Sequence, residues 1–355
     1  MSGRTPPPRF TAAPYLASKS PSAGVVRLDT NEGSTPDPAL LRRLAEADVS
    51  LIRAYPSTRR LEQLLAERLG VAPDQVVVTN GADVALDRAC RAWLAPGREL
   101  LVAEPTFEMF YRFAEMTGAT LVGVPWVDRF PLDELLGRVT PSTGVIAIVS
   151  PNNPTGLVCS GSELRRIAEA APGSVVLLDH VYVEYADEDL TALALTLPNV
   201  IVVRTLSKAW GLAGCRVGYA VADPAATAVI RSAGDPFPVA GPSLFLAEAR
   251  VSAGAGALVH HVGQVRRERD DLLERFGAWA CPCPPSQGNF VFPLVGTEAA
   301  GIRSALAAEG LLVRHFADRP GLAENLRITL PGNQATYDRL AQALERLLGR
   351  IGGTP

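Results

Sequence analysis

Short apolar runs alternate with longer amphipathic runs up to about residue 240, and this alternation constrains the fold more than any other feature. The apolar runs lack polar alternation, as expected for strands buried on both faces of a sheet. The amphipathic runs have helical spacing, and one of them opens with the capping box Ser160-Gly-Ser-Glu163. Strands that alternate with helices predict an α/β fold.

The expected elements follow from these runs. Strands are expected at residues 76–79, 99–102, 120–124, 145–149, 175–178 and 200–204. Helices are expected at residues 61–69, 82–94, 107–117 and 161–170. Beyond residue 240 we expect a long helix at about 243–275, strands at 289–293 and 311–315, and helices near 298–309 and at 334–349.

This change of pattern predicts two domains. Residues 46–240 are expected to form a large cofactor-binding domain, and residues 241–355 a smaller α+β domain. Residues 1–45 are expected to supply an N-terminal arm and the start of the smaller domain. A length of 355 residues fits one large α/β domain with a smaller one attached.

Composition excludes several classes of protein. The net charge of −3 gives no basic excess for nucleic acid or anionic membranes, and no apolar stretch is long enough to span a bilayer. The first ten residues are proline-rich and lack the apolar core of a secretory signal. Five cysteines, an odd number, favour reduced thiols in a cytoplasm. Cys281 and Cys283 are too close for the usual Cys-x-x-Cys spacing, so we expect no metal site.

The segment from Arg204 to Gly218, RTLSKAWGLAGCRVG, carries the strongest chemical signal. Lys208 follows a strand and is flanked by apolar and small residues, an unusual setting for a surface lysine. A desolvated lysine has a lowered pKa and can attack an aldehyde. The planar guanidinium of Arg216 suits a dianionic phosphate, to which the hydroxyls of Thr205 and Ser207 can also donate.

Two further signals also follow strands. The rigid turn Ser150-Pro-Asn-Asn-Pro-Thr-Gly156 follows one strand, and Asp179 with Tyr182 follows the next. Together with the lysine, these groups match what a pyridoxal ring requires. Asp179 can keep the pyridine nitrogen protonated, and Asn153 with Tyr182 can hold the ring oxygen O3′. Lys208 can form the Schiff base with pyridoxal 5′-phosphate and later move the α-proton.

These motifs resemble the fold-type I pyridoxal-phosphate aminotransferases of class I/II, and within them the histidinol-phosphate aminotransferase subgroup. The resemblance implies a large domain with a mostly parallel seven-stranded sheet plus a smaller α+β domain. It covers nearly the whole chain, and its other motifs are Pro14-Tyr15, Leu28-Asp-Thr-Asn-Glu32, Ala54-Tyr55-Pro56, Asn80-Gly-Ala-Asp83, Glu104-Pro-Thr-Phe107, Ser286-Gln-Gly-Asn-Phe290, Leu312-Val-Arg314 and Leu326-Arg-Ile-Thr329.

Cofactor contacts carry over by position as implications of this resemblance. Ala82 and Asp83 open a helix whose free N–H groups suit the cofactor phosphate. Phe107 occupies the place of an aromatic ring stacked on the pyridine. Tyr55 matches a tyrosine that reaches the cofactor phosphate of a neighbouring subunit, which implies a homodimer with shared active sites.

Substrate contacts are implied in the same way. Arg327 matches the arginine that holds the anionic group of the substrate, and it lies in an apolar run where a buried arginine needs an anion. Arg314 and Tyr15 match further contacts to that group. A carboxylate and a phosphate fit these residues equally well.

Two departures from the family pattern bear on the site. The loop Asn31-Glu32-Gly33-Ser34-Thr35-Pro36 replaces a common Asn-Glu-Asn-Pro, and we expect it near the substrate mouth. His180 replaces the acidic residue that usually follows the cofactor aspartate, and we interpret it as a packing or hydrogen-bonding residue.

The expected function is amino transfer between an amino acid or amino phosphate and a 2-oxo acid, by a ping-pong mechanism, in amino-acid biosynthesis. The alternative on the same fold is a decarboxylase of the threonine-phosphate type, or a cyclase or oxidase of specialised metabolism. A nicotinamide dehydrogenase would need Gly-x-Gly-x-x-Gly after its first strand, and the sequence has none there. A regulator that borrows this fold would need an added DNA-binding domain, for which the N-terminus leaves no room.

Overall fold

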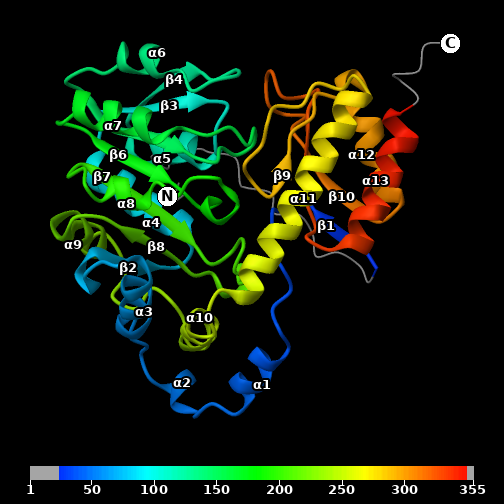
Figure 1. Cartoon of the computed structure of the whole chain (residues 1–355). Helices are drawn as coiled ribbons and strands as arrows, with labels where there is room; N and C mark the ends of the chain where they lie inside the picture. The colour runs from blue at the N-terminus through cyan, green and yellow to red at the C-terminus, as the bar shows by residue number, and fades with distance from the viewer. Residues whose placement is uncertain (1–23, 350–355) are drawn as a thin grey trace, which may run out of the picture.

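The computed structural model describes residues 24–349. Two β-sheets stand side by side, a seven-stranded sheet on the left of Figure 1 and a four-stranded sheet on the right. Strands β2 to β8 form the larger sheet: β2 (Val76–Thr79), β3 (Glu99–Glu104), β4 (Thr120–Pro125), β5 (Thr143–Val149), β6 (Val175–Asp179), β7 (Val200–Thr205) and β8 (Gly218–Val221).

The larger sheet has the strand order β2-β8-β7-β6-β5-β3-β4. Its neighbouring pairs from β4 to β7 are parallel, and β8 runs antiparallel to both β2 and β7. The mostly parallel seven-stranded sheet is therefore confirmed. Six of its strands start within two residues of the predicted positions. The short strand β8 was missed, because its Gly-Tyr-Ala-Val sequence gives little β signal.

Helices cover both faces of the larger sheet, and this explains its uniformly apolar strands. Helices α4 (Ala82–Trp93), α5 (Met109–Thr117) and α9 (Pro224–Ser232) cover one face, where Leu100 and Val102 point. Helices α6 (Leu132–Leu136), α7 (Gly161–Ala170) and α8 (Thr191–Ala194) cover the other, where Leu101 and Ala103 point. Successive side chains of a strand alternate in direction, so both sets are buried.

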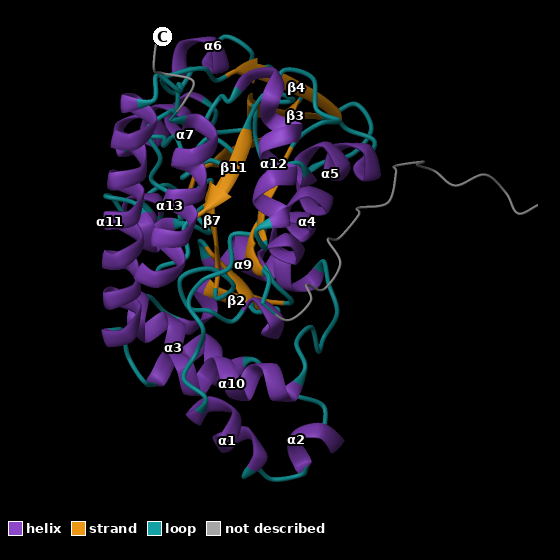
Figure 2. Cartoon of the chain, turned by 90° about the vertical axis from the view of Figure 1, so that its right-hand side faces the viewer, coloured by secondary structure: helices purple, strands orange, loops and turns teal. Residues whose placement is uncertain are grey.

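The smaller sheet joins both ends of the described chain. Its order is β1-β10-β11-β9, from β1 (Val26–Leu28), β10 (Leu311–His315), β11 (Leu326–Thr329) and β9 (Phe290–Val291). Helices α11 (Gly256–Ala278), α12 (Ala299–Ala308) and α13 (Gln334–Leu348) pack beside it, as Figures 1 and 2 show. The sheet thus brings residues from the N-terminal segment next to residues from the last quarter of the sequence.

A third group of helices lies at the lower end in both views. It comprises α1 (Ala39–Ala45), α2 (Ser50–Arg53), α3 (Arg59–Leu69) and α10 (Gly241–Ser252). The single helix predicted for about 243–275 is wrong, because α10 and α11 are separate helices. Gly254, between them, has φ +84°, a left-handed conformation that an α-helix cannot continue through. Within residues 24–349, no helix is long and apolar enough to cross a bilayer.

Candidate active site

A cavity of about 570 Å³ opens where the larger and smaller sheets face each other. Its floor comes from the carboxyl ends of β5, β6 and β7, which are neighbours in the sheet. Twelve residues of the predicted site line it: Ala82, Asp83, Phe107, Asn153, Asp179, Tyr182, Thr205, Ser207, Lys208, Arg216, Arg314 and Arg327.

One predicted site residue within the described part of the chain does not line this cavity. Tyr55 is 83% exposed and lies on the outer surface, where its ring stacks on Phe237 with centroids 4.5 Å apart. Tyr15 lies outside the described residues. The cavity of one subunit is therefore built without the phenol of Tyr55.

Lys208 has a desolvated amine. Its Nζ donates a hydrogen bond to the carbonyl oxygen of Thr30 at 3.1 Å and lies 5.7 Å from the centre of the Tyr182 ring. Burial, together with the positive charge of Arg327, lowers the pKa of Lys208 from 10.5 to about 8. A substantial neutral fraction at physiological pH follows, and the neutral amine is the form that attacks an aldehyde.

The loop at residues 31–36 lies against the backbone that carries Lys208. A Cβ at Gly33 would stand 1.7 Å from the carbonyl oxygen of Lys208, so only glycine fits there. A Cβ at Gly211 would likewise stand 2.2 Å from the carbonyl oxygen of Ser34. The loop was expected near the substrate mouth. Its first residue, Asn31, lines the cavity with Asp29 and Thr30, whereas residues 33–36 are not among the lining residues.

Asp179 is the last residue of β6 and is only 2% exposed. The backbone N–H of Val181 donates to its Oδ1 at 3.4 Å. Burial, with the nearby charge of Asp83, raises the pKa of Asp179 from 3.8 to about 7. A carboxylate in this setting favours a cationic partner from the cavity, such as a protonated pyridine nitrogen.

The Asn153 loop is fixed from within by its neighbour Asn152. The side chain of Asn152 donates to the carbonyl of Pro105 and to the hydroxyl of Thr155, both at 2.8 Å. Asn153 is thereby presented to the cavity, where its Oδ1 accepts a 2.5 Å hydrogen bond from Nη1 of Arg327. The side-chain amide nitrogen of Asn153 is the group suited to a ring oxygen.

Tyr182 points into the cavity beside this loop. Its hydroxyl oxygen accepts a 2.9 Å hydrogen bond from Nδ2 of Asn31, whose own Oδ1 accepts from the hydroxyl of Thr329. Burial raises the pKa of Tyr182 to about 12, so its phenol stays protonated and can donate to a ligand oxygen.

The start of α4 forms a cradle for an anion. Gly81, with φ +82°, precedes the helix and leaves the first-turn N–H groups free of partners within the helix. A Cβ at Gly81 would stand 2.5 Å from Nη2 of Arg216, so glycine lets that guanidinium close over the helix end. Arg216 also donates to Oγ of Ser207 and Oδ2 of Asp83 at 3.4 and 3.3 Å.

The hydroxyl of Thr205, which was expected to donate to the cofactor phosphate, has other partners in the structure. It donates to the carbonyl of Val217 at 3.3 Å and accepts from the N–H of Ser207 at 3.1 Å. A hydroxyl has one proton, and the proton of Thr205 is already donated to Val217. Thr205 therefore stabilises the backbone around Ser207 and Val217. The hydroxyl oxygen of Ser207 accepts from Arg216, so its own proton can be donated to an anion.

Arginines surround the outer part of the cavity. Arg314 on β10 pairs directly across the antiparallel ladder with Arg327 on β11. Arg327, 8% exposed, also donates to the carbonyl of Asp29 at 2.7 Å. Arg319 forms an ion pair with Glu108 at 2.6 Å, and Arg27 pairs with Asp29 at 3.0 Å. Glu108 and Asp29 offset the charges of Arg319 and Arg27, and the positive charge of Arg314 and Arg327 suits an anionic substrate.

Sequence reasoning gave no role to several residues at the site. Asn31 and Thr30 contact Tyr182 and Lys208, yet they appeared only as part of a motif from residue 28 to 32. Arg319 and Glu108 lie on opposite walls and are 211 residues apart in sequence. No local pattern could reveal that pair. The place of Thr30 and Asn31 in the motif from Leu28 to Glu32 was the signal that the sequence offered. The structure adds that Asn31 has a left-handed backbone, with φ 55°.

The donor set fits pyridoxal 5′-phosphate group by group. Arg216, Ser207 and the α4 N-terminus suit its phosphate, Asp179 its pyridine nitrogen, and Asn153 with Tyr182 its ring oxygen. The fold and this site define a class of protein, the fold-type I pyridoxal-phosphate enzymes.

Comparison with known proteins identifies the family within that class. Residues 22–344 match the family described as aminotransferase class I and II. The chain is 34% identical to the aromatic amino acid aminotransferase of Mycobacteroides abscessus, over 91% of this chain and 93% of that one. It is 32% identical to histidinol-phosphate aminotransferase 1 of Cupriavidus pinatubonensis, over 95% and 94%. The chain therefore belongs to the class I and II aminotransferases.

A solved structure supports the cofactor. The histidinol-phosphate aminotransferase of Sinorhizobium meliloti in complex with pyridoxal 5′-phosphate superimposes with a TM-score of 0.83. It is 26% identical, with 92% of this chain and 91% of that one covered. The chain is a pyridoxal-phosphate-dependent transaminase that takes amino and 2-oxo substrates, and decarboxylation is not favoured.

Proposed function

We propose that this transaminase takes its amino group from a donor with one anionic group and a planar side chain. The observation that carries the proposal is that Arg314 and Arg327 are cross-strand partners on β10 and β11 and that both line the cavity. Apolar groups of Phe107, Met109 and Phe316 line the same cavity and suit a flat ring. Histidinol phosphate and the aromatic amino acids both have these features.

The chain's own residues would share the work as follows. Pyridoxal phosphate, when bound, supplies an electron sink for the negative charge that develops at the substrate α-carbon. Lys208 would hold the cofactor covalently and, as a free amine, take the proton from the α-carbon. Asp179 would keep a proton on the pyridine nitrogen, while Asn153 and Tyr182 hold the ring in place. Arg327 would orient the donor by its anionic group.

The donor can be tested with the purified enzyme loaded with the cofactor. The visible absorption of the bound cofactor is followed after addition of histidinol phosphate, phenylalanine, tyrosine or glutamate, each alone, and the keto product is quantified. Discharge of the band by a ring-bearing donor is the expected result. A response to glutamate alone would contradict the proposal. Release of carbon dioxide in place of a keto product would revive the decarboxylase alternative.

We also infer a homodimer. Exposed apolar side chains gather near Tyr55, on α1, α2 and the segment after α9: Leu41, Val49, Ile52 and Phe237. Such a cluster is costly to leave in water and is typical of an interface. In a homodimer this face would place Tyr55 at the cofactor phosphate of the other subunit.

We further propose a cytoplasmic enzyme of amino-acid biosynthesis, in keeping with its odd number of cysteines.

The domain boundaries remain our proposal, with residues 46–240 as the large domain. Helix α10 packs against α3, α1 and α2, so its contacts lie with the lower helical group and not with the smaller sheet. Limited proteolysis would test the boundary, and cleavage near Gly254 would place α10 with the large domain.

A further inference from the structure

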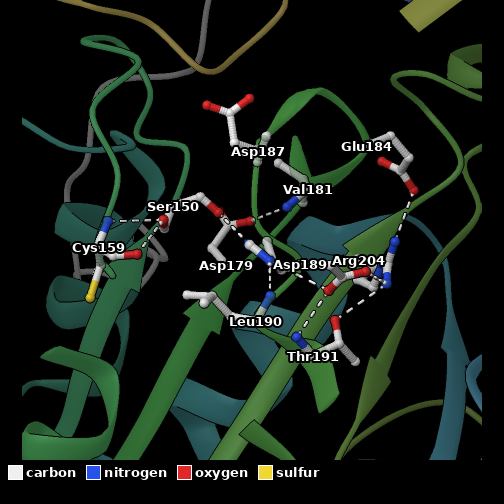
Figure 3. A network of polar contacts seen from close by, with 12 residues as sticks. Ser150, Cys159, Asp179, Val181, Glu184, Asp187, Asp189, Leu190, Thr191 and Arg204 are labelled. Atoms are coloured by element: carbon white, nitrogen blue, oxygen red, sulfur yellow. Dashed lines mark hydrogen bonds and ion pairs between the residues drawn. The ribbon is translucent and has the colours of Figure 1, made fainter. Parts of the chain in front are cut away.

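His180 follows the cofactor aspartate directly and is only 1% exposed. The backbone N–H of Leu190 donates to its Nε2 at 3.1 Å, so Nε2 must be the acceptor nitrogen. The proton of a neutral ring then lies on Nδ1, which donates to the carbonyl oxygen of Ser150. Figure 3 labels Ser150 and Leu190, which supply the partners of the two ring nitrogens. Both nitrogens are thus satisfied only by a neutral imidazole of one tautomer.

These contacts link the turn that carries Asn153, which lines the cavity, to the segment before α8. Ser150 opens the turn that carries Asn153, and its N–H donates to the carbonyl of Asp179 at 3.0 Å. Its hydroxyl accepts from the N–H of Cys159 at 3.0 Å, which fixes the far end of the same turn. The ring of His180 therefore bridges the Asn153 turn, at Ser150, to the segment before α8, at Leu190.

Taken together, the charged groups near His180 do not favour a protonated ring, because they are already paired with one another. Asp189 lies with Oδ1 3.7 Å from Nε2, but its other oxygen accepts a 3.0 Å hydrogen bond from Arg204. Arg204 also pairs with Glu184 at 3.2 Å. Burial, aided by the positive charge of Arg204, lowers the pKa of His180 to about 4 in spite of Asp189.

We propose that His180 is a positioning residue, whose Nδ1–H holds the Asn153 turn in register with Asp179. The proposal rests on the cofactor site assigned above. An ionised carboxylate at this position would have no proton to donate to Ser150. In this chain the neutral Nδ1–H donor of His180 therefore sets the spacing between the side chains of Asn153 and Asp179.

Three substitutions separate the two hydrogen bonds. His180→Asn can retain the donor to Ser150, His180→Gln can retain the acceptor for Leu190, and His180→Leu removes both. Each variant is titrated with pyridoxal phosphate to give its Kd and absorption maximum, and its kcat and KM for the preferred donor are measured. We expect the Kd to stay within about threefold of wild type for Asn, and to rise about tenfold or more for Gln and Leu. In these two, kcat should fall more than KM rises.

Several results would overturn the proposal. If all three variants melt at lower temperatures but keep the wild-type Kd and spectrum, His180 is a stabilising residue only. If Asn is impaired as severely as Leu, the bond to Ser150 is not the relevant contact. If Arg327→Gln loses donor affinity while all three His180 variants keep their cofactor contacts, the positioning role fails alone and the proposed function survives.

A measurement on the wild-type enzyme tests the proposal even if the variants do not fold. Selective ¹⁵N labelling of the four histidines allows the ring tautomers to be read by NMR. We expect one ring to stay neutral with the proton on Nδ1 down to about pH 5. His261 is also buried, so a His261→Gln sample identifies its signals, and those of the buried ring that remains belong to His180. Four rings that all titrate near pH 6.5, or the ring of His180 protonated on Nε2, would contradict the proposal.

Discussion

Arg314 and Arg327 pair directly across the antiparallel strands β10 and β11, and both side chains line the active-site cavity. Like charges opposite each other in a ladder destabilise a sheet. We propose that a substrate anion bound by both guanidiniums compensates for this repulsion, so that stability would be exchanged for binding as at other functional sites.

Replacement of Arg327 by Gln should therefore separate binding from stability. We expect kcat/KM for the donor to fall about 100-fold or more, because a charge-assisted contact to the substrate is lost. Arg314→Gln should have a smaller effect, and neither change should lower the melting temperature of the apoprotein, because each relieves the repulsion between the two guanidiniums. Arg303→Gln on the exposed face of α12 is the control. A large stability loss with unchanged KM would contradict this prediction.

Lys208→Ala should abolish turnover and leave the fold intact, because no other amine lines the cavity within the described residues. The sequence contains two lysines, Lys19 and Lys208, which makes the test unusually clean. Borohydride reduction of the loaded enzyme followed by mass spectrometry should place the cofactor on Lys208. Lys19→Ala is the matched control and should react as wild type. Cofactor found on Lys19, or transamination by Lys208→Ala near the wild-type rate, would sink the assignment.

Asp179→Asn should stabilise the apoprotein in a pH-dependent way. The pKa of Asp179 is raised from 3.8 to about 7, so between these values the folded state binds more protons than the unfolded state. Stability is therefore lost as the pH rises through this window. We expect the variant to melt at a higher temperature than wild type at pH 8, and the difference to vanish near pH 4. Its Kd for the cofactor should rise at pH 8, where the carboxylate is needed; an unchanged Kd would argue against the pyridine contact.

The Glu108–Arg319 ion pair connects α5 with the loop between β10 and β11 across the mouth of the cavity. Both groups are partly exposed, so Arg319→Gln should change the free energy of unfolding by less than about 1 kcal/mol. The donor KM should nevertheless rise several-fold, because the pair holds one cavity wall against the other. Arg346→Gln is a matched control, since Arg346 pairs with Glu309 at the same 2.6 Å but lies outside the cavity. Equal KM values in the two variants would contradict the prediction.

Ile52→Asp should weaken the proposed homodimer. Ile52 is 74% exposed in the single chain, and a carboxylate there would have to be buried in an interface of two copies. Sedimentation velocity should show dissociation at micromolar concentrations, and the Kd for the cofactor should rise because each site loses the partner's phenol. Val127→Asp is a control of almost equal exposure, 73%, outside the apolar cluster. A monomeric wild-type enzyme with full activity would rule out the shared site.

Much of the fold could be predicted because its signals are local. The strand residues are apolar on both faces since helices cover the larger sheet on both sides, and this is visible in sequence as unbroken apolar runs. The capping box at Ser160 was also correct, because its two hydrogen bonds join residues three apart. Strand β8 and the break before α11 gave only weak local signals and were missed.

The sequence by itself determined the chemistry of the site: a lysine in apolar surroundings, an aspartate at a strand end, and an arginine eight residues beyond the lysine. Only the tertiary structure decided how these groups are held. Asn31 reaches Tyr182 across 151 residues, and Arg327 reaches Asn153 across 174. The physical reason is that strand and helix preferences act between near neighbours, whereas a contact between distant residues depends on how whole sheets pack. The two sheets meet at one cavity, and that meeting turns separate motifs into one site.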